Sequence, residues 1–196
     1  MQSDESINLR ISDLELVRKA GQGEDTAFHE LVDRYANDLF RLAYSLTGNA
    51  DDAEDILQET FIKAFRHIDT FRNEQSGAFQ AWLQRICVNN SISHLRKMKR
   101  RRDNFLSLSD MHTEPTDKNS SPEEKVEHQR FLNFVEQAVN RLSPKQKVIF
   151  DLRYTQHKTI RSIAHLLGSS ESNVKTQLSR SVKKLRKSLK PLWEET

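Results

Sequence analysis

Cysteine, glycine and proline are scarce in this chain of 196 residues, which contains one cysteine, five glycines and four prolines. One cysteine cannot form a disulfide within the chain, and Cys87 falls on an apolar helical stripe, where a buried hydrophobe is favoured over a nucleophile. The seven histidines are scattered without metal-ligand spacing, and there is no glycine-rich phosphate loop. We therefore expect no metal, no cofactor and no enzymatic activity, which disfavours an enzyme acting on nucleic acid.

Long apolar runs are absent as well. No stretch of roughly 18 uncharged apolar residues could cross a membrane, and the N-terminal MQSDESINLR lacks the basic and apolar segments of a signal peptide. No window alternates apolar and polar residues over the length of a strand. The sequence therefore predicts an all-α, cytoplasmic protein without membrane insertion.

The charged residues nearly balance, with 31 Lys and Arg against 28 Asp and Glu, so the clustering of charge is more informative than its sum. The few glycines mark the helix boundaries between these clusters. The first predicted domain covers residues 1–102. In chain order it contains a short helix at about 11–19, a longer helix from near Asp25 to Gly48 and an acidic helix from Asp51. A loop at 70–77 and a basic helix ending at Arg102 follow.

The acidic helix starts with crowded carboxylates, which are favoured by the unpaired N–H groups of a first helical turn. Asp51 and Glu54 match a capping box. At about 100° per residue one apolar stripe predicts a core face, formed by Ala53, Ile56, Leu57, Phe61, Ala64, Phe65 and Ile68. The opposite face carries Asp52, Asp55, Glu59 and Arg66 around Ile62. An exposed apolar residue surrounded by carboxylates indicates a partner-binding surface. The alternative is an acidic face that only contacts water and carries one exposed isoleucine without a binding role.

The basic helix has the reverse polarity. Its apolar stripe at helical spacing consists of Phe79, Trp82, Leu83, Ile86 and Cys87. Because Phe79 and Trp82 lie on this stripe, they are predicted as core residues rather than DNA-stacking residues. Beyond Cys87 the stripe moves sideways, which predicts a bend or break near Asn89 and Asn90. The helix ends in six basic residues without an acid, a density that suits a polyanion, at Arg96, Lys97, Lys99, Arg100, Arg101 and Arg102.

The helical pattern disappears over residues 103–122, which contain Pro115, Pro122 and several Ser, Asp and Asn residues. This composition predicts a flexible linker, and its four acids outnumber its one base, Lys118. A second helical domain, residues 123–196, follows the linker. Its predicted elements are a helix from Glu123 to Leu142, a helix capped by Ser143 and opened by Pro144, a helix carrying Ile160, Ile163, Ala164 and Leu167, and a helix capped by Ser169 or Ser170.

The last two helices have the layout of a helix-turn-helix, because Gly168 follows the small Ala164 by four residues between two helical patterns. The second of them has a predicted inner stripe of Val174, Leu178, Val182, Leu185 and Leu189. Its outer face offers short hydroxyls that can reach base edges in a major groove, and cations that can reach phosphates. These residues are Ser172, Lys175, Thr176, Ser179, Arg180, Lys183 and Lys187.

Two blocks of the chain resemble the bacterial RNA polymerase sigma factors of the sigma-70 family, specifically the extracytoplasmic-function (ECF) group. DAEDILQETFIKAF and AFQAWLQRICVNN resemble sigma region two, whereas LSPKQKVIFDLRY and IAHLLGSSESNVKTQLSRSVKKLRKSL resemble sigma region four. The blocks stand in the family order with the linker between them. The resemblance implies a protein that binds core RNA polymerase and directs initiation by recognising the minus-ten and minus-thirty-five promoter elements.

The resemblance also implies roles for individual residues. The acidic helix would contact the clamp helices of the polymerase's largest subunit through Asp52, Asp55, Gln58, Glu59 and Ile62. The minus-ten element, including a flipped-out base, would be bound by Phe71, Arg72, Asn89, Asn90, Arg96, Lys99 and Arg100. The minus-thirty-five element would be read by the helix-turn-helix through Ser172, Lys175, Thr176, Ser179, Arg180 and Lys183.

Further partners follow from the same resemblance. They are the flap of the polymerase's second-largest subunit and an anti-sigma factor, which could hold the protein at the inner membrane. A self-sufficient helix-turn-helix regulator is the alternative function, and such a protein normally dimerises to read paired half-sites. That alternative leaves the face with Asp52, Asp55 and Glu59 without a role, and the sequence shows no obvious dimerisation helix.

Overall fold

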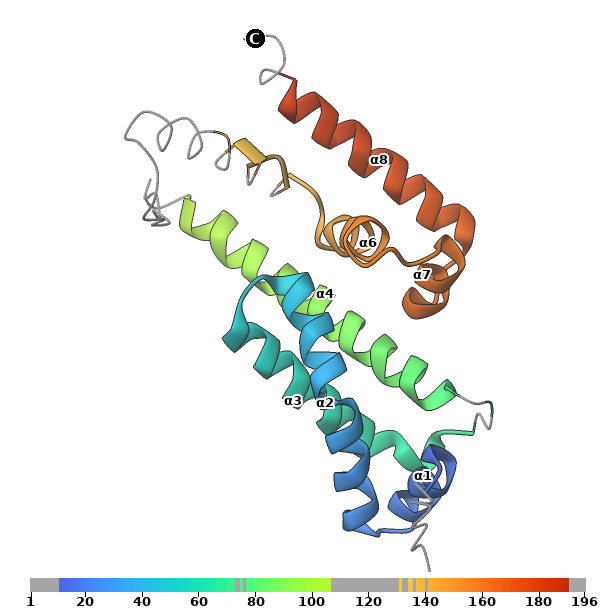
Figure 1. The fold of residues 1–196 in the computed structure, drawn as a ribbon. Helices are drawn as coiled ribbons and strands as arrows, with labels where there is room; N and C mark the ends of the chain where they lie inside the picture. The colour runs from blue at the N-terminus through green and yellow to red at the C-terminus, as the bar shows by residue number, and fades with distance from the viewer. Residues whose placement is uncertain are drawn as a thin grey trace, which may run out of the picture. The chain divides into compact units, whose positions relative to one another are not determined.

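The structure is a computed structural model that describes residues 11–72, 75, 77–106, 131, 134, 135, 137–139 and 141–190. Every regular element among these residues is helical (Figure 1), which confirms the predicted all-α fold. The chain forms two compact units, Met1–Asn90 and Ser91–Thr196. The predicted linker lies outside the described residues except for 103–106, which form the helical end of α4.

Helices α1 (Asp13–Gly21) and α2 (Asp25–Thr47) begin the first unit. The hydroxyl of Ser12 accepts a hydrogen bond from the N–H of Glu15 and caps α1. Gly48 ends α2 in the left-handed region at φ 76°, where glycine has no steric penalty. The end of α2 at Gly48 agrees with the glycine pattern of the sequence.

Helix α3 (Ala50–His67) runs into the short 3₁₀ helix η1 (Ile68–Thr70). Its N-cap is Asn49, whose side chain accepts from the N–H of Asp52 at 2.9 Å. The predicted capping box of Asp51 and Glu54 is therefore wrong, because the helix starts before Asp51. The Asp51 carboxylate lies inside the first turn, where the positive end of the helix dipole favours it.

The core face of α3 is narrower than its apolar stripe. Ala53, Ile56, Ala64 and Ile68 are buried, as predicted. The side chain of Phe65 is 48% exposed, which corrects its assignment to the core. Phe65 lies at the edge of the stripe, whereas Thr60 lies near the centre and is buried with its hydroxyl bonded to the carbonyl of Ile56.

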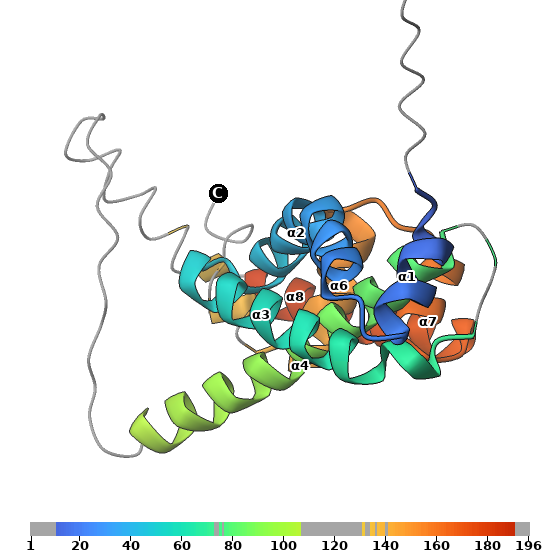
Figure 2. The ribbon, with the colours of Figure 1, turned by 90° about the horizontal axis from the view of Figure 1, so that it is seen from below.

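Helix α4 (Ala78–Leu106) is continuous through Asn89 and Asn90 (Figures 1 and 2), so the predicted break is wrong. The apolar stripe is interrupted there because a polar residue takes a core position. Asn90 is 3% exposed, and its Nδ2 donates to the hydroxyl of Thr60 at 3.1 Å. Cys87 and Phe79 are buried on the same helix, as predicted.

Helices α6 (Pro144–Tyr154), α7 (Ile160–Leu167) and α8 (Glu171–Leu189) form the described core of the second unit. Ser143 and Gln146 make a reciprocal capping box at the start of α6. The buried apolar residues of these helices are Val148, Ile149, Leu152, Ile163, Ala164, Leu166, Val174 and Leu178. Val182 was predicted on the inner stripe but is 38% exposed, because Ser181 is the residue of that turn that is buried.

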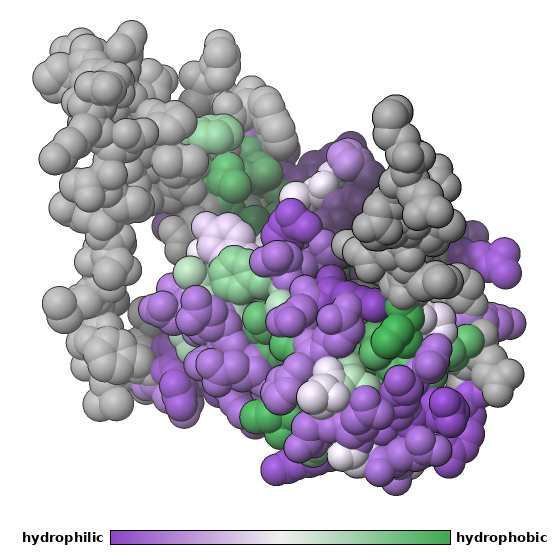
Figure 3. Space-filling model, turned by 60° about the horizontal axis from the view of Figure 1, so that its bottom comes forward, coloured by the Kyte–Doolittle hydropathy of each residue, from purple (hydrophilic) through white to green (hydrophobic). Residues whose placement is uncertain are grey.

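Of the helix predicted from Glu123 to Leu142, the described residues 131, 134, 135 and 137–139 are helical. On the face of the molecule in Figure 3, hydrophobic residues lie between hydrophilic ones. Scattered apolar side chains are normal on a soluble surface, so only grouped ones point to function. No helix within the described residues is long and apolar enough to span a membrane.

Candidate functional site

The outer face of α3 presents the acidic residues predicted to bind a partner. Asp55, Gln58 and Glu59 are exposed, Asp52 is half-buried, and Ile62 is 51% exposed among them. Glu59 pairs with Lys63 at 2.8 Å, and both side chains are about half exposed. Exposed pairs of this kind contribute little, at most about 1 kcal/mol, so Glu59 can exchange Lys63 for another cation.

An apolar surface that the sequence did not predict adjoins this acidic face. Phe65 is exposed beside Ile62, and its ring lies 5.0 Å from that of Phe28. Together with Phe61 these side chains line a cavity of about 360 Å³. The position of Phe65 at the edge of the apolar stripe, next to Ile62, was the signal available in the sequence.

Helix α4 carries the predicted DNA residues on its outer side. Asn89, Arg96 and Arg100 are exposed, and Lys99 is half-buried. Asn90 is buried, and its Oδ1 accepts from Lys63 Nζ at 2.5 Å. Because both ends of its amide are bonded inside the protein, Asn90 is not part of this exposed face.

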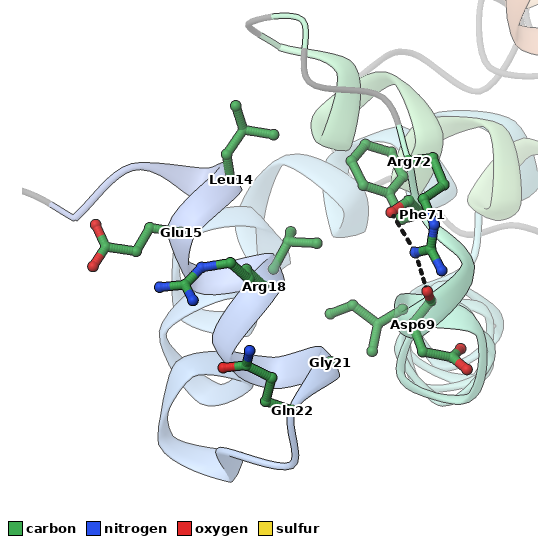
Figure 4. Close-up of a pocket in the computed structure, with 10 residues that line it drawn as sticks. Leu14, Glu15, Arg18, Gly21, Gln22, Asp69, Phe71 and Arg72 are labelled. Atoms are coloured by element: carbon green, nitrogen blue, oxygen red, sulfur yellow. Dashed lines mark hydrogen bonds between the residues drawn. The ribbon is translucent and has the colours of Figure 1, made fainter.

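Phe71 and Arg72 directly follow η1 in the first unit (Figure 4). The ring of half-buried Phe71 packs against Trp82, with centroids 5.3 Å apart, and against Phe79 at 5.6 Å. Arg72 is exposed, and its Nη1 donates to the carbonyls of Asp69 and, at 3.2 Å, Phe71. The loop thus holds an aromatic ring and a guanidinium side by side.

Helices α7 and α8 form the predicted helix-turn-helix. Gly168 ends α7 at φ 56°, and the hydroxyl of Ser170 accepts from the N–H of Asn173 to start α8. Gln146 of α6 holds α8 in place by donating to Gln177 at 3.2 Å. All the residues predicted to face DNA are exposed: Ser172, Lys175, Thr176, Ser179, Arg180 and Lys183.

Comparisons with known proteins agree with this arrangement. The family described as sigma-70 region 2 matches residues 31–102, and that described as sigma-70, region 4 matches residues 135–185. The ECF RNA polymerase sigma factor SigW of Bacillus subtilis is 31% identical over 183 residues, which cover 90% of this chain and 96% of SigW. The chain belongs to the ECF RNA polymerase sigma factors. Its function is to direct transcription initiation by core RNA polymerase at promoters.

Two further proteins resemble this ECF sigma factor. BldN of Streptomyces coelicolor, also an ECF sigma factor, is 33% identical over 172 residues, which cover 88% of this chain and 64% of BldN. The sigma factor RpoE of Bartonella quintana, solved in complex with the anti-sigma factor NepR, is 25% identical with a TM-score of 0.51. That similarity covers 83% of this chain and 96% of RpoE. These findings favour a sigma factor over a self-sufficient regulator.

The two matched regions contain most of the surfaces described above. Region 2 includes α3, the Phe71 loop and α4 up to Arg102, whereas region 4 includes α6, α7 and most of α8. Helix α1 precedes the region 2 match. The acidic face and the two basic helices of this ECF sigma factor are therefore parts of its matched regions.

Proposed function

We propose that this ECF sigma factor binds core polymerase through the outer face of α3 and binds promoter DNA through α4, the Phe71 loop and α8. The observation that carries this assignment is the separation of charge by helix. The exposed acids Asp55 and Glu59 lie on α3, whereas the exposed face of α4 carries Arg96 and Arg100. Carboxylates repel phosphates, so α3 is suited to a basic protein surface and α4 to nucleic acid.

The surface of α3 offers two kinds of interaction to polymerase. Asp52, Asp55 and Glu59 provide charge, which increases association rates and orients the partner. Ile62 and Phe65, both about half exposed, provide apolar area that water covers in the free protein. We assign the clamp helices of the largest subunit to this surface, with Gln58 as a neutral polar contact.

The minus-ten element is assigned to the Phe71 loop and α4. Flipping a base out of the duplex costs a few kcal/mol of stacking free energy. Stacking on an aromatic ring and hydrogen bonds to an exposed amide can recover that energy. Phe71 and Asn89 supply these groups. Arg72, Arg96, Lys99 and Arg100 add cations along the adjoining backbone, whereas buried Asn90 is left out of the assignment.

The minus-thirty-five element is assigned to α8. Its N-terminal turns expose Ser172, Thr176 and Ser179, and Arg180 follows at the end of this polar stretch. An arginine can make two hydrogen bonds to the O6 and N7 atoms of guanine in the major groove. Lys175 and Lys183 are placed to contact phosphates.

The remaining partners are also proposals. RpoE of Bartonella quintana is bound by an anti-sigma factor in its solved complex, which supports the same kind of regulator for this chain. A flap contact for region 4 is assigned by the family resemblance. The protein acts in the cytoplasm, where its polymerase is.

Charge reversal on α3 tests the polymerase surface. The double change Asp55→Arg and Glu59→Arg should weaken binding to core polymerase by about tenfold or more, because two attractive contacts become repulsive. The matched control reverses two exposed acids of α2, Asp33→Arg and Asp38→Arg. Affinity is measured by titration of labelled protein with core polymerase, and circular dichroism confirms the helical content of each variant. Equal affinities for both doubles would contradict the assignment.

The function as a whole is tested by transcription in vitro. Core polymerase with this protein is incubated with genomic fragments, and transcription start sites are mapped. We expect starts that are absent with core polymerase alone and that share two sequence elements at constant spacing. Starts without such a shared pair would contradict the assignment of two DNA-reading surfaces.

A further inference from the structure

Four aromatic side chains of the first unit form a connected group. The ring of Tyr35, on α2, lies 5.9 Å from that of Phe79, on α4, with an angle of 63° between the two planes. Phe79 in turn lies 5.6 Å from Phe71, at 86°, and 5.6 Å from Trp82. Aromatic pairs prefer edge-to-face or offset geometries, so each ring limits the orientations of its neighbour. Phe79 therefore links Tyr35 to Phe71.

Phe79 is the buried centre of this group. It is 2% exposed, whereas Tyr35, Phe71 and Trp82 are each half-buried. Protein interiors are close-packed, so a ring at the centre cannot turn unless the rings around it move as well. The orientation of Tyr35 therefore influences which surface of Phe71 faces outward.

The far end of the Tyr35 side chain is held by α1. Its hydroxyl donates to Oδ2 of Asp13, in the first turn of that helix. Oδ1 of the same carboxylate accepts from Arg34 Nη1 at 3.0 Å, and this nitrogen also donates to the carbonyl of Ile11 at 2.8 Å. Both side chains of the Arg34 and Asp13 ion pair are partly buried, so water screens it less than a surface pair. Asp13 is therefore a well-fixed acceptor for Tyr35.

The hydroxyl of Tyr35 orients its ring. Burial, and then the hydrogen bond to Asp13, raise the pKa of Tyr35, which keeps the hydroxyl protonated as a donor. The side chain is thus held at both ends, by its Cβ on α2 and by its hydroxyl at α1. A phenyl ring without the hydroxyl would fill the same space but could turn away from its position against Phe79. The hydroxyl therefore gives direction to the ring rather than volume to the core.

Helix α1 also packs on the segment that carries Phe71. At its end, Gly21 lies so close to η1 that a Cβ there would be 3.7 Å from the Cα of Asp69 (Figure 4). Phe71 directly follows η1, and its N–H donates to the carbonyl of Ile68 at 3.1 Å. The backbone of Phe71 is therefore held by η1, and its ring by the group that Tyr35 orients.

We propose that Tyr35 is a positioning residue for promoter opening, and that its hydroxyl, held by Asp13, orients the aromatic group that presents Phe71 to DNA. The proposal rests on the assignment of Phe71 to the minus-ten element. It adds two residues that lie outside every DNA-binding surface assigned above. Promoter opening then depends on a hydrogen bond between α1 and α2.

Removing the hydroxyl alone tests the proposal. The variant is Tyr35→Phe, and the matched control is Tyr44→Phe, an exposed tyrosine of the same helix. Holoenzyme is assembled from core polymerase and the full chain, and open complexes at a mapped promoter are followed by permanganate reactivity. We expect Tyr35→Phe to form about three- to tenfold fewer open complexes, the effect of one net hydrogen bond. Its affinity for core polymerase should equal that of the control, because the proposed polymerase surface lies on α3.

A double-mutant cycle with Phe71→Ala separates positioning from a general loss of stability. If Tyr35 acts through Phe71, Tyr35→Phe should cause no further loss once Phe71 is removed, since coupled residues are not additive. Asp13→Ala should reproduce the loss caused by Tyr35→Phe, and the two changes together should add little.

The fluorescence of Trp82 reports on the same ring geometry without DNA, because its ring lies 5.3 Å from that of Phe71. The chain has two tryptophans, so the measurement is made in a Trp193→Phe background. Acrylamide should quench Trp82 more strongly in Tyr35→Phe than in Tyr44→Phe, because a displaced Phe71 covers Trp82 less.

Three other results would overturn the proposal in distinguishable ways. Equal open complexes for Tyr35→Phe and Tyr44→Phe, with Phe71→Ala still defective, would remove the positioning role and leave the proposed function intact. Additive losses in the cycle with Phe71→Ala would show that the hydroxyl does not act through that ring. Normal promoter opening by Phe71→Ala would overturn both the minus-ten assignment of Phe71 and this inference.

Discussion

Asn89 and Asn90 are adjacent and chemically identical, yet they have opposite surroundings on α4. Asn89 is exposed, whereas Asn90 is 3% exposed and belongs to a chain of polar contacts inside the first unit. Lys63 donates to Asn90, Asn90 donates to Thr60, and the Thr60 hydroxyl donates to a backbone carbonyl of its own helix. The same residue type therefore serves packing at one position and is open to a ligand at the next.

This difference predicts different effects of the same substitution. Asn90→Ala should lower the free energy of unfolding by about 1–3 kcal/mol, because buried Thr60 loses a donor and half-exposed Lys63 loses an acceptor. Asn89→Ala should change it by less than about 0.5 kcal/mol, since the side chain is exposed, while weakening promoter opening. Urea unfolding followed by circular dichroism measures both. Similar stability losses in the two variants would contradict the buried network.

These residues also show what the sequence could and could not predict. Burial of Cys87 and Phe79 followed from apolar spacing alone. Burial of Asn90 did not, because its partners Thr60 and Lys63 lie on another helix and only the fold brings them together. Phe65 was misassigned for a related reason: the stripe that contains it is wider than the surface that α2 and α4 cover.

At the scale of elements, helix ends were more predictable than helix interiors. Gly48 and Gly168 end α2 and α7 with positive φ, and Ser143 and Ser170 cap α6 and α8, as local sequence indicated. Caps act within one turn, so a sequence window contains all the partners involved. The continuity of α4 depends on long-range burial instead. Its basic end and the outer face of α8 were predictable because exposure leaves charge patterns intact.

The continuous α4 helix predicts the salt dependence of promoter binding. Its described basic end places Arg96, Lys99 and Arg100 along one helix without a break. If each contacts a phosphate, replacing all three by alanine should reduce the slope of log affinity against log salt by roughly 2–3, since each contact releases about 0.7–0.9 counterion. Holoenzyme affinity is measured by fluorescence anisotropy over a salt series. An unchanged slope would show that these cations do not contact the backbone.

At the scale of the whole molecule, charge and connectivity indicate that the protein depends on polymerase for specificity. Region 2 and region 4 are separate matches, and the predicted acidic linker, residues 103–122, joins them. In the proposed assignment, each region offers a single helix to the grooves of DNA. Two weak contacts become one strong contact when a partner fixes their spacing, because the second binding event is then intramolecular.

The isolated chain should therefore bind promoter DNA weakly and with little sequence preference, and core polymerase should add specificity that depends on both promoter elements.

Within the complex with core polymerase, Arg180→Ala should cost about 1–3 kcal/mol if its guanidinium contacts a base, and the loss should disappear on a promoter mutated at the base pair that it reads. Lys187→Ala, an exposed cation two turns further along α8, should instead weaken binding to all sequences alike. Electrophoretic mobility shifts with and without core polymerase, on the natural promoter and on one with each element replaced, separate these effects. Tight, specific binding by the isolated chain that core polymerase does not change would contradict the requirement for polymerase. Equal sequence dependence of the Arg180 and Lys187 variants would contradict only the prediction that Arg180 reads a base.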